Sequence, residues 1–156
     1  MDTREYFETL EFLAQSPERV AALIVGIAGE ALRFKPAPDA FSALEQVCHL
    51  RDVEREGYSR RVQRMLDEDN PLLEGIDGAQ LANERDYQSQ DLVEALKEFG
   101  VARGESIRLL QSASAAQRER PGHFEDAVVF TLAGLAGMMR AHDSEHLREL
   151  ESLRQP

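Results

Sequence analysis

Apolar residues recur at three- and four-residue intervals along most of the chain, whereas the alternation typical of strands is nearly absent. This spacing predicts a protein built of helices. A short opening helix is expected over residues 3–14. A longer one is expected to begin at Ser16-Pro17, because serine is a favoured N-cap and proline at the first helical position loses no intrahelical hydrogen bond. Its apolar stripe extends to Ala31, and the Lys-Pro-Ala-Pro segment 35–38 ends the pattern.

Two further helices have recognisable starts. Ser42 and Glu45 form a capping box, from which a helix is expected to extend to about Asp67. Another helix is expected from Ser89, with Asp91 in its first turn, where the helix dipole favours an anion. Apolar residues at helical spacing follow both starts, so each helix has a face that it can bury.

The last helix is expected from Val128, or from Thr131 if that threonine is its N-cap, to about Leu153. The two longest connections, 69–88 and 113–127, have room for short helical turns, and loops of this length often border a site. Four long helices joined by such loops predict an all-α, antiparallel four-helix bundle.

Length and composition agree with one small folded unit. The chain has 156 residues, and domains most often have about 100–150, so a single domain over residues 1–156 is expected. The one cysteine, Cys48, rules out an intramolecular disulfide and is compatible with a reducing compartment. The chain has neither a signal-peptide pattern nor an apolar stretch of about 20 residues. A soluble, cytoplasmic protein is predicted.

The formal net charge is −11. A surface of this charge repels the phosphate backbone, which argues against nucleic acid as a partner. It also argues against docking on an anionic membrane.

Concentrated chemistry is found only in the last helix, at His142 and His146. Residues four apart on a helix lie about 6 Å apart along the axis and on the same face, so both imidazoles can reach one ion. The two histidines also fill the gap between Met139 and Leu150 in the apolar stripe, so they should face the bundle interior. Two interpretations remain open: a hydrogen-bonded pair in the core, or two ligands of a metal.

A third ligand is harder to derive. His123 follows Pro121-Gly122 and is expected in a loop, exposed to solvent. His49 lies within a predicted helix, just outside the edge of its apolar arc, on the side of several acidic residues. Spacing alone leaves two interpretations of His49: a surface histidine in an acidic face, or a ligand at the mouth of the bundle.

Two motifs resemble those of the DinB-like superfamily. The first is in the second long helix: it begins with Phe41-Ser42 and continues through His49-Leu50 to an acidic residue and a glutamate, Asp52 and Glu54. The second is His142-Asp143 with another histidine, His146, at the fourth position. Members commonly have tryptophan in the place of Phe41. The resemblance follows nearly the whole chain in order.

The resemblance implies a four-helix bundle of up-down-down-up topology that often forms a homodimer. It also implies a divalent metal, zinc or nickel in most members, bound by three histidines. Matched position by position, these are His49, His142 and His146. Relatives with assigned activities use low-molecular-weight thiols, so the resemblance implies a metal-dependent thiol S-transferase acting on small electrophiles. The alternatives are a metal-dependent hydrolase and a non-catalytic bundle in which the metal ties two helices together.

The neighbours of these histidines have less definite roles. Cys48 is expected to be a small buried residue, because it lies about two turns inside a helix, away from the amides that lower a thiol pKa. Asp143 is expected either to orient a histidine ring or to reach an arginine of another helix. The three carboxylates beside His49, which are Glu45, Asp52 and Glu56, are expected to form a solvated acidic face. Glu45 or Asp52 could instead close a four-ligand metal site.

Overall fold

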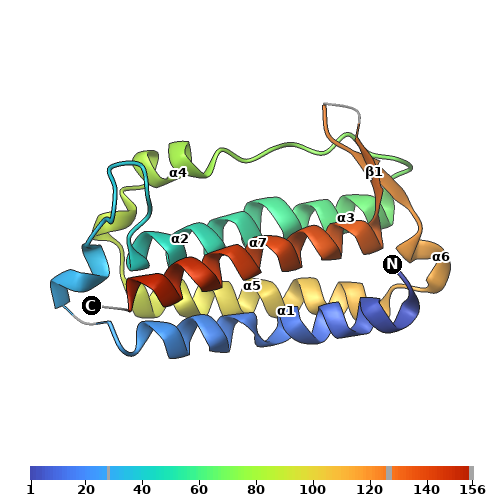
Figure 1. Ribbon diagram of the computed structural model, residues 1–156. Coiled ribbons are helices and arrows are strands. Elements are labelled where there is room, and N and C mark those ends of the chain that lie inside the picture. Colours follow the sequence, from blue (N-terminus) through green and yellow to red (C-terminus); the bar gives the residue numbers. More distant parts are fainter. Residues whose placement is uncertain (28, 126–127, 155–156) are drawn as a thin grey trace.

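The structure, a computed structural model, describes residues 1–27, 29–125 and 128–154. Four long helical segments lie side by side (Figure 1). The first and last of them, α1 (Thr3–Ile24) and α7 (Leu132–Leu153), run in one direction, and the two between them in sequence run in the other. Because α1 and α2 each pack against α5 (Leu92–Ser112) and α7, the bundle is up-down-down-up and antiparallel. The predicted fold is confirmed.

The first long helix, α1, differs from the prediction. Its residues were expected to form two helices that meet at Ser16-Pro17, but α1 is continuous and ends at Ile24 rather than Ala31. The buried Ser16 hydroxyl donates to the Phe12 carbonyl, 3.2 Å away, as in a helix interior. Proline removes one helical donor, and the carbonyl four residues earlier, on Leu13, accepts a hydrogen bond from another helix instead, as described below.

The second long segment covers the predicted 42–67 but is not uniform. It consists of α2 (Ala43–Asp52), a π-helical turn, η2 (Val53–Tyr58), and α3 (Ser59–Asp67). The predicted capping box is present, with Ser42 accepting from the Glu45 amide and the Glu45 carboxylate accepting from the Ser42 amide. Single π-turns within α-helices are frequent at functional sites.

The other helix starts are close to the prediction. Asp91 is the N-cap of α5 and accepts from the Glu94 amide, so this helix begins three residues later than predicted. Thr131 caps α7, as one of the two alternatives proposed.

The connections contain more structure than helical periodicity revealed. The long connection after α3 crosses over α2 and α3 (Figure 1). A two-stranded antiparallel hairpin, which was not predicted, pairs residues 121–123 with 129–131 near the end of the bundle where α1 begins. The last residues of the predicted 113–127 connection, 126–127, are outside the described residues. The short elements are η1 (Gly29–Arg33), α4 (Gly78–Glu84), η3 (Tyr87–Ser89), α6 (Ala115–Arg118), β1 (Pro121–His123) and β2 (Val129–Thr131).

The apolar core consists of two clusters with a polar layer between them. On α7, Met139 belongs to one cluster and Leu150 to the other. On α5, Ile107 and Phe99 are divided in the same way. The buried polar side chains of α7 and α5 fall between these pairs. The layer contains Ser16, Glu54, Arg103, Asp143 and His146.

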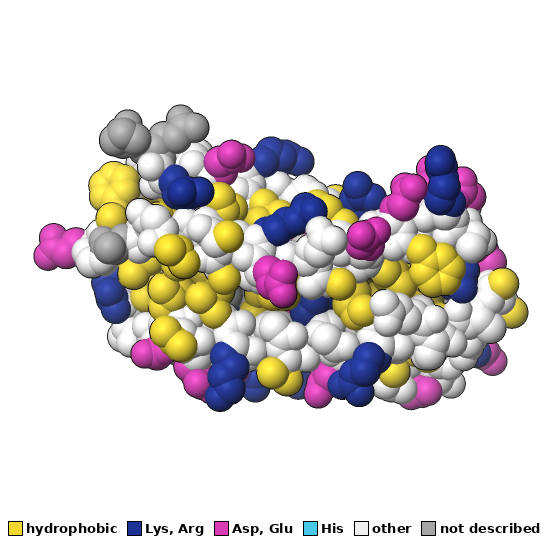
Figure 2. Space-filling model, turned by 90° about the horizontal axis from the view of Figure 1, so that it is seen from below, with side chains coloured by type: hydrophobic (Ala, Val, Ile, Leu, Met, Phe, Trp, Pro, Cys, Tyr) yellow, Lys and Arg dark blue, Asp and Glu magenta, His cyan; other side chains and the backbone are white. Residues whose placement is uncertain are grey.

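Two surface properties follow from the described residues. None of their helices has both the length and the apolar character needed to cross a bilayer. On the face seen in Figure 2, apolar side chains lie among charged ones of both signs, and no histidine is visible. The side chains of the described histidines are therefore not exposed on this face.

Candidate metal centre

Three histidine side chains from two helices meet in the polar layer. His49 comes from α2, and His142 and His146 come from α7. The His142 Nε2 atom lies 3.1 Å from the Nε2 atom of His49 and 3.1 Å from that of His146. One nitrogen of each ring lies within 4.8 Å of those of the other two. The structure thus brings together the three residues that the family resemblance named.

The position of His49 corrects the interpretation from spacing. Spacing placed it at the edge of an apolar arc and left two interpretations open, a surface histidine or a ligand at the mouth of the bundle. The structure excludes the surface histidine, because the exposed fraction of His49 is only 9%. All ten residues of α2 are buried, because the connection and α4 cover the side of this helix that a plain four-helix bundle leaves open. Helical periodicity identifies the face of a helix that is turned toward the bundle axis. It does not show that another segment, distant in sequence, buries the opposite face.

Two of the three imidazoles, those of His49 and His146, lie in surroundings that disfavour their charged form. Burial is the main cause that lowers the pKa of His49 to about 3, and the nearby His146 and His142 act in the same direction. Burial also lowers the pKa of His146 to about 4, with His142 acting in the same direction. Two of the rings are therefore neutral at pH 7, and neutral imidazole is the form that binds a metal.

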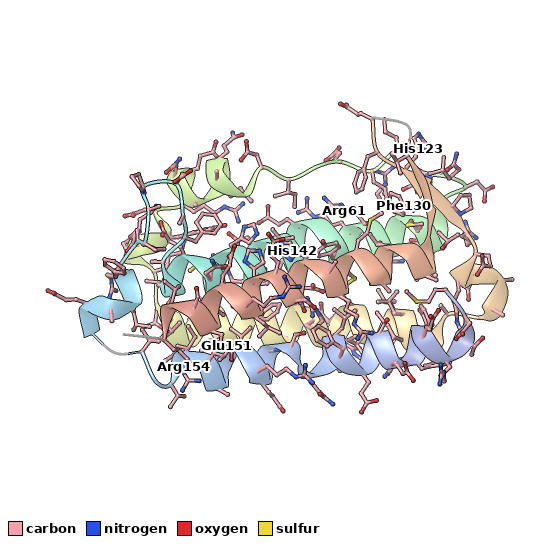
Figure 3. The ribbon with its side chains drawn as sticks, in the orientation of Figure 1. Arg61, His123, Phe130, His142, Glu151 and Arg154 are labelled. Carbon is pink, nitrogen blue, oxygen red and sulfur yellow. The ribbon has the colours of Figure 1, made fainter. Side chains whose placement is uncertain are left out.

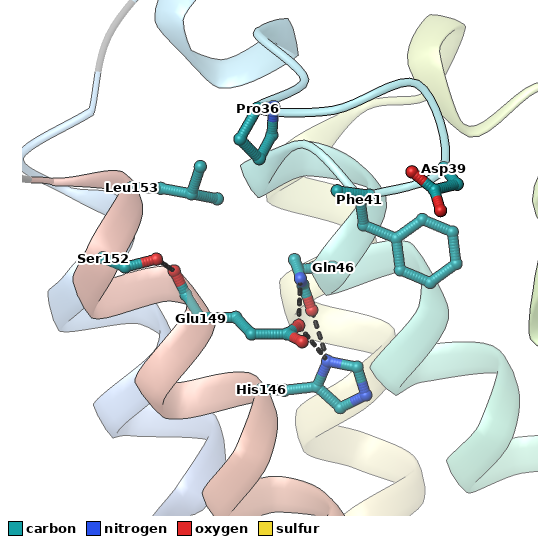
Figure 4. A pocket seen from close by; sticks show the side chains of 9 residues that line it. Pro36, Asp39, Phe41, Gln46, His146, Glu149, Ser152 and Leu153 are labelled. Carbon is teal, nitrogen blue, oxygen red and sulfur yellow. Dashed lines mark hydrogen bonds and ion pairs between the residues drawn. The ribbon is translucent and has the colours of Figure 1, made fainter.

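A chain of hydrogen bonds fixes the orientation of His146. The buried Gln46 donates from Nε2 to the Glu149 carboxylate at 2.5 Å and presents its carbonyl oxygen to Nδ1 of His146. Glu149 also lies 3.3 Å from that nitrogen. Both contacts, which Figure 4 shows, place the ring hydrogen on Nδ1. This leaves a lone pair on Nε2, the atom that lies 3.1 Å from Nε2 of His142. Metal-bound histidines typically have such a partner on their other nitrogen.

Asp143 meets the second of its two proposed roles. Arg103 of α5 holds both of its oxygens, at 2.5 and 3.1 Å. The distance from Asp143 to Nδ1 of His142 is 3.9 Å, which is too long for a hydrogen bond. Arg103 also donates to Glu54 at 3.0 Å and to the Leu13 carbonyl at 3.1 Å. This guanidinium therefore joins all four helical segments and replaces the donor that the proline in α1 removed.

The donor set fits a divalent transition metal. Two nitrogens that share a tetrahedral zinc ion at about 2.0–2.1 Å lie roughly 3.3–3.4 Å apart, close to the separations found here. A cation at the centre of the three nitrogens would accept a lone pair from each ring. Nδ1 of His49 and Nδ1 of His142 have no hydrogen-bond partner among the described residues.

The carboxylates near His49 are not the solvated face that was predicted. Glu45 and Asp52 are buried, with exposed fractions of 5% and 1%. Glu45 belongs to the capping box and pairs with Lys35 at 3.3 Å. Asp52 accepts from three neighbours, which are Arg51, Arg85 and the Tyr87 hydroxyl. The third carboxylate, Glu56, is partly exposed and also pairs with Arg85.

One end of the site is covered by α4. Gly78, its first residue, lies so close to His49 that a Cβ atom there would be 2.4 Å from Cε1 of the ring. On another side the Phe41 ring lies 5.1 Å from the His49 ring, centre to centre. A glycine at position 78 is therefore required for the first turn of α4 to lie on the imidazole.

A pocket of about 320 Å³ opens beside the triad (Figure 4). His146 and Gln46 line it together with Phe41, and Asp39 and Glu149 add two carboxylates. No lysine or arginine is among the described residues that line it. A small molecule in this pocket would lie next to a metal ligand.

Two other candidate residues lie outside the triad. His123 is far from His142 (Figure 3). It lies in a strand rather than in a loop, is partly buried, and its Nδ1 is 3.3 Å from the Asn70 side-chain oxygen. Cys48 is buried as predicted, and burial raises the pKa of its thiol to about 11. Such a thiol is protonated at neutral pH.

The sequence interpretation missed several residues that touch the triad. Gln46 precedes His49 by three residues, and Glu149 follows His146 by three, so helical spacing alone places each beside a proposed ligand. The spacing in the sequence could therefore have indicated both residues. Tyr58, whose ring lies 5.7 Å from the His142 ring in an edge-on contact, is the last residue of the π-turn, and Gly78 is the first residue of α4. The sequence contains no comparable signal for these two contacts.

The fold and the site together define the class of protein. It is a four-helix bundle in which three histidines from two helices converge on a candidate metal centre. The chain belongs to the DinB superfamily, whose sequence model matches residues 13–150. A search of curated proteins found no match.

The fold is similar to that of YfiT from Bacillus subtilis, which is described as "a probable metal-dependent hydrolase with an unusual four-helix bundle topology". The TM-score is 0.91 at 18% identity, and the match covers 98% of this chain and 87% of YfiT. The family assignment confirms the resemblance inferred from the two histidine motifs.

Proposed function

We propose that the protein binds one divalent metal ion, zinc or nickel, through His49, His142 and His146, and that it is a metal-dependent enzyme acting on a small molecule. The observation that carries this proposal is the convergence of three Nε2 atoms with no fourth protein ligand beside them among the described residues. Catalytic zinc sites typically have three protein ligands and keep a further position open, whereas structural sites are closed by four.

The partners of the nearby carboxylates favour the open arrangement. A non-catalytic bundle would need a closed ligand sphere, with Glu45 or Asp52 as the fourth ligand. Glu45 is engaged by its helix cap and by Lys35, and Asp52 is engaged by two arginines and a tyrosine. Moving either carboxylate would leave buried partners without an acceptor, which is costly.

Lewis acidity is the chemistry that a divalent metal supplies in such a site, since it lowers the pKa of a coordinating water or thiol toward neutrality. The chain holds this site with three imidazoles, and Gln46 and Glu149 orient one of them. No activated protein nucleophile is found at the triad among the described residues, where the Cys48 thiol is buried and protonated. The nucleophile is then an external one.

With water as the nucleophile the reaction is a hydrolysis, and the description of YfiT supports this alternative. With a low-molecular-weight thiol it is S-transfer to an electrophile, which the family resemblance supports. We propose hydrolysis of a small substrate and thiol S-transfer as two candidate reactions of the same site. The pocket beside His146 has room for a small molecule in either reaction.

The test begins with protein that has been purified without a chelator or a histidine tag. Its metal content is measured, the metal is removed, and zinc and nickel are restored in turn. Each form is assayed with chromogenic esters and amides for hydrolysis, and with several thiols and a fluorogenic electrophile for transfer. The matched variants are His142→Ala in the triad and His123→Ala outside it.

About one equivalent of metal per chain is expected for the wild type and for His123→Ala, and far less for His142→Ala. Activity should fall with the metal in the same variant. Full metal occupancy of His142→Ala would contradict the ligand assignment. Metal binding without either activity would instead support the non-catalytic alternative.

A further inference from the structure

Three arginine side chains of the described residues are buried, and one of them lacks a carboxylate. Arg103 pairs with Glu54 and Asp143, and Arg51 pairs with Asp52 and Glu98. The third, Arg61 of α3, is only 8% exposed, yet no carboxylate of the described residues pairs with it. Buried charges in proteins are nearly always paired. An unpaired guanidinium is therefore a candidate binding group for an anion.

The contacts of Arg61 leave part of the guanidinium unused. Its Nε and Nη2 atoms both donate to the Glu74 carbonyl, at 3.2 and 2.8 Å. Its two faces lie against the rings of Tyr58 and Phe124, 5.3 and 5.1 Å from the ring centres. The remaining nitrogen, Nη1, has no acceptor among the described residues. It lies over Gly57, where a Cβ atom would be 3.4 Å away from it.

This group is a neighbour of the histidine triad. The ring of Tyr58 lies between the two, because it contacts the guanidinium on one side and the His142 ring on another. Figure 3 shows Arg61 and His142 beneath the connection that crosses α2 and α3. The phenol O–H of Tyr58 can donate a hydrogen bond. That hydroxyl makes no hydrogen bond within the described residues.

The other flank of the triad has the opposite charge. The pocket beside His146 contains Asp39 and Glu149 and no cationic side chain among its described lining. An anionic group is repelled from that pocket and attracted to Arg61, since like charges in a partly buried site raise the free energy of binding. The two flanks therefore orient a substrate with respect to the triad.

We propose that Arg61 and Tyr58 bind a carboxylate group of the substrate while its reactive group lies at the histidine triad. The free N–H groups of Nη1 and the phenol O–H are the donors. This inference rests on the proposed function and adds the substrate class: a small molecule with a carboxylate at one end. It also assigns the acidic pocket to the uncharged or cationic end.

The probes are two hydroxamates of equal length, succinate monohydroxamate and the corresponding uncharged amide. The hydroxamate group chelates the metal in both, so the pair differs only at the far end. Zinc-loaded protein is titrated with each by calorimetry. The wild type should bind the carboxylate at least about tenfold more tightly, the range expected for a charge-assisted hydrogen bond. Arg61→Gln should abolish that preference and leave the affinity for the amide unchanged.

Arg60→Gln is the matched control, because it removes the same charge from an exposed residue of the same helix and should keep the preference. Arg61→Gln also loses the contact with Glu74, so its zinc content and unfolding midpoint are measured. Tyr58→Phe removes only a hydroxyl and should reduce the preference several-fold, which keeps the proposal testable if Arg61→Gln does not fold.

Equal affinities of the wild type for the two hydroxamates would overturn the proposal. So would a preference that survives both Arg61→Gln and Tyr58→Phe. Zinc content is measured before any hydroxamate is added. A protein that contains no zinc at this stage would overturn the proposed function itself, and with it this inference. A protein that contains zinc but does not prefer the carboxylate would overturn the carboxylate site alone.

Discussion

The polar layer of the bundle contains two groups of buried side chains that differ in how far the chain completes them. Around Arg103, one guanidinium is matched by two carboxylates and a backbone carbonyl, and Oε1 of Glu54 is the one buried oxygen there without a partner among the described residues. In the histidine triad, three rings direct nitrogens at one another, and two of these rings have no partner for Nδ1 among the described residues. The same contrast separates Arg103 from Arg61.

This difference distinguishes the buried side chains that hold the bundle together from those that bind a ligand. A buried group whose partners all come from the chain holds helices together. A buried group that lacks them is kept for something that the chain does not supply, because an unsatisfied polar atom costs about 1–3 kcal/mol. If this distinction holds, substitutions in the first group should affect stability, and substitutions in the second should affect ligand binding.

The largest effect is expected for Arg103→Met, which leaves Glu54 and Asp143 buried without a cation. Breaking a buried ion pair from one side costs about 3–5 kcal/mol, and the free energy of unfolding should fall by that amount in urea denaturation. Arg4→Met is the control, since Arg4 is exposed and its ion pair with Glu8 is on the surface. It should change stability by less than about 0.5 kcal/mol. A loss below about 1 kcal/mol for Arg103→Met would contradict the scaffold role.

A smaller effect is expected for Gly78→Ala, which affects both the cover and the site. The added Cβ would overlap the His49 ring, so α4 or the imidazole has to move, at a cost of about 1–3 kcal/mol. Zinc affinity should fall as well, because a ligand is displaced. Gly75→Ala, in the same connection but with nothing within 4 Å of the added atom, is the control. Similar zinc affinities for the two variants would show that α4 does not hold His49 in place.

For Gln46→Leu the expected effect is confined to the site. His146 loses one of the two acceptors near its Nδ1 hydrogen and keeps Glu149. Loss of such a partner typically lowers metal affinity about 10–100-fold. Competition with a chromogenic chelator measures the zinc dissociation constant. Gln63→Leu, an exposed glutamine, should leave the constant unchanged. An unchanged zinc affinity in Gln46→Leu would mean that this side chain serves packing alone.

Much of the fold could be predicted from the sequence, because caps and apolar spacing are local. Ser42, Asp91 and Thr131 cap helices at or near the expected positions. The predicted break at Ser16-Pro17 was wrong, since the donor that repairs the proline comes from Arg103, 90 residues away in sequence. No local pattern contains that information. The hairpin was missed for a similar reason, because its strands are only three residues long.

Some residues of the candidate site could likewise be predicted from the sequence, and others could not. His142 and His146 follow from their spacing on a core stripe, whereas His49 required a family motif, because its burial depends on a cover that periodicity does not describe. Arg61 and Tyr58 had no sequence signal at all. The homodimer and the cytoplasmic location stay predictions, as does the single domain.

The most direct test of the metal centre is X-ray diffraction from crystals of the zinc-loaded protein, with data collected on both sides of the zinc absorption edge. The account predicts one strong anomalous peak per chain, about 2.0–2.1 Å from the Nε2 atoms of His49, His142 and His146, and no such peak in crystals of His142→Ala. A peak at another position, or none at the triad under saturating zinc, would contradict it.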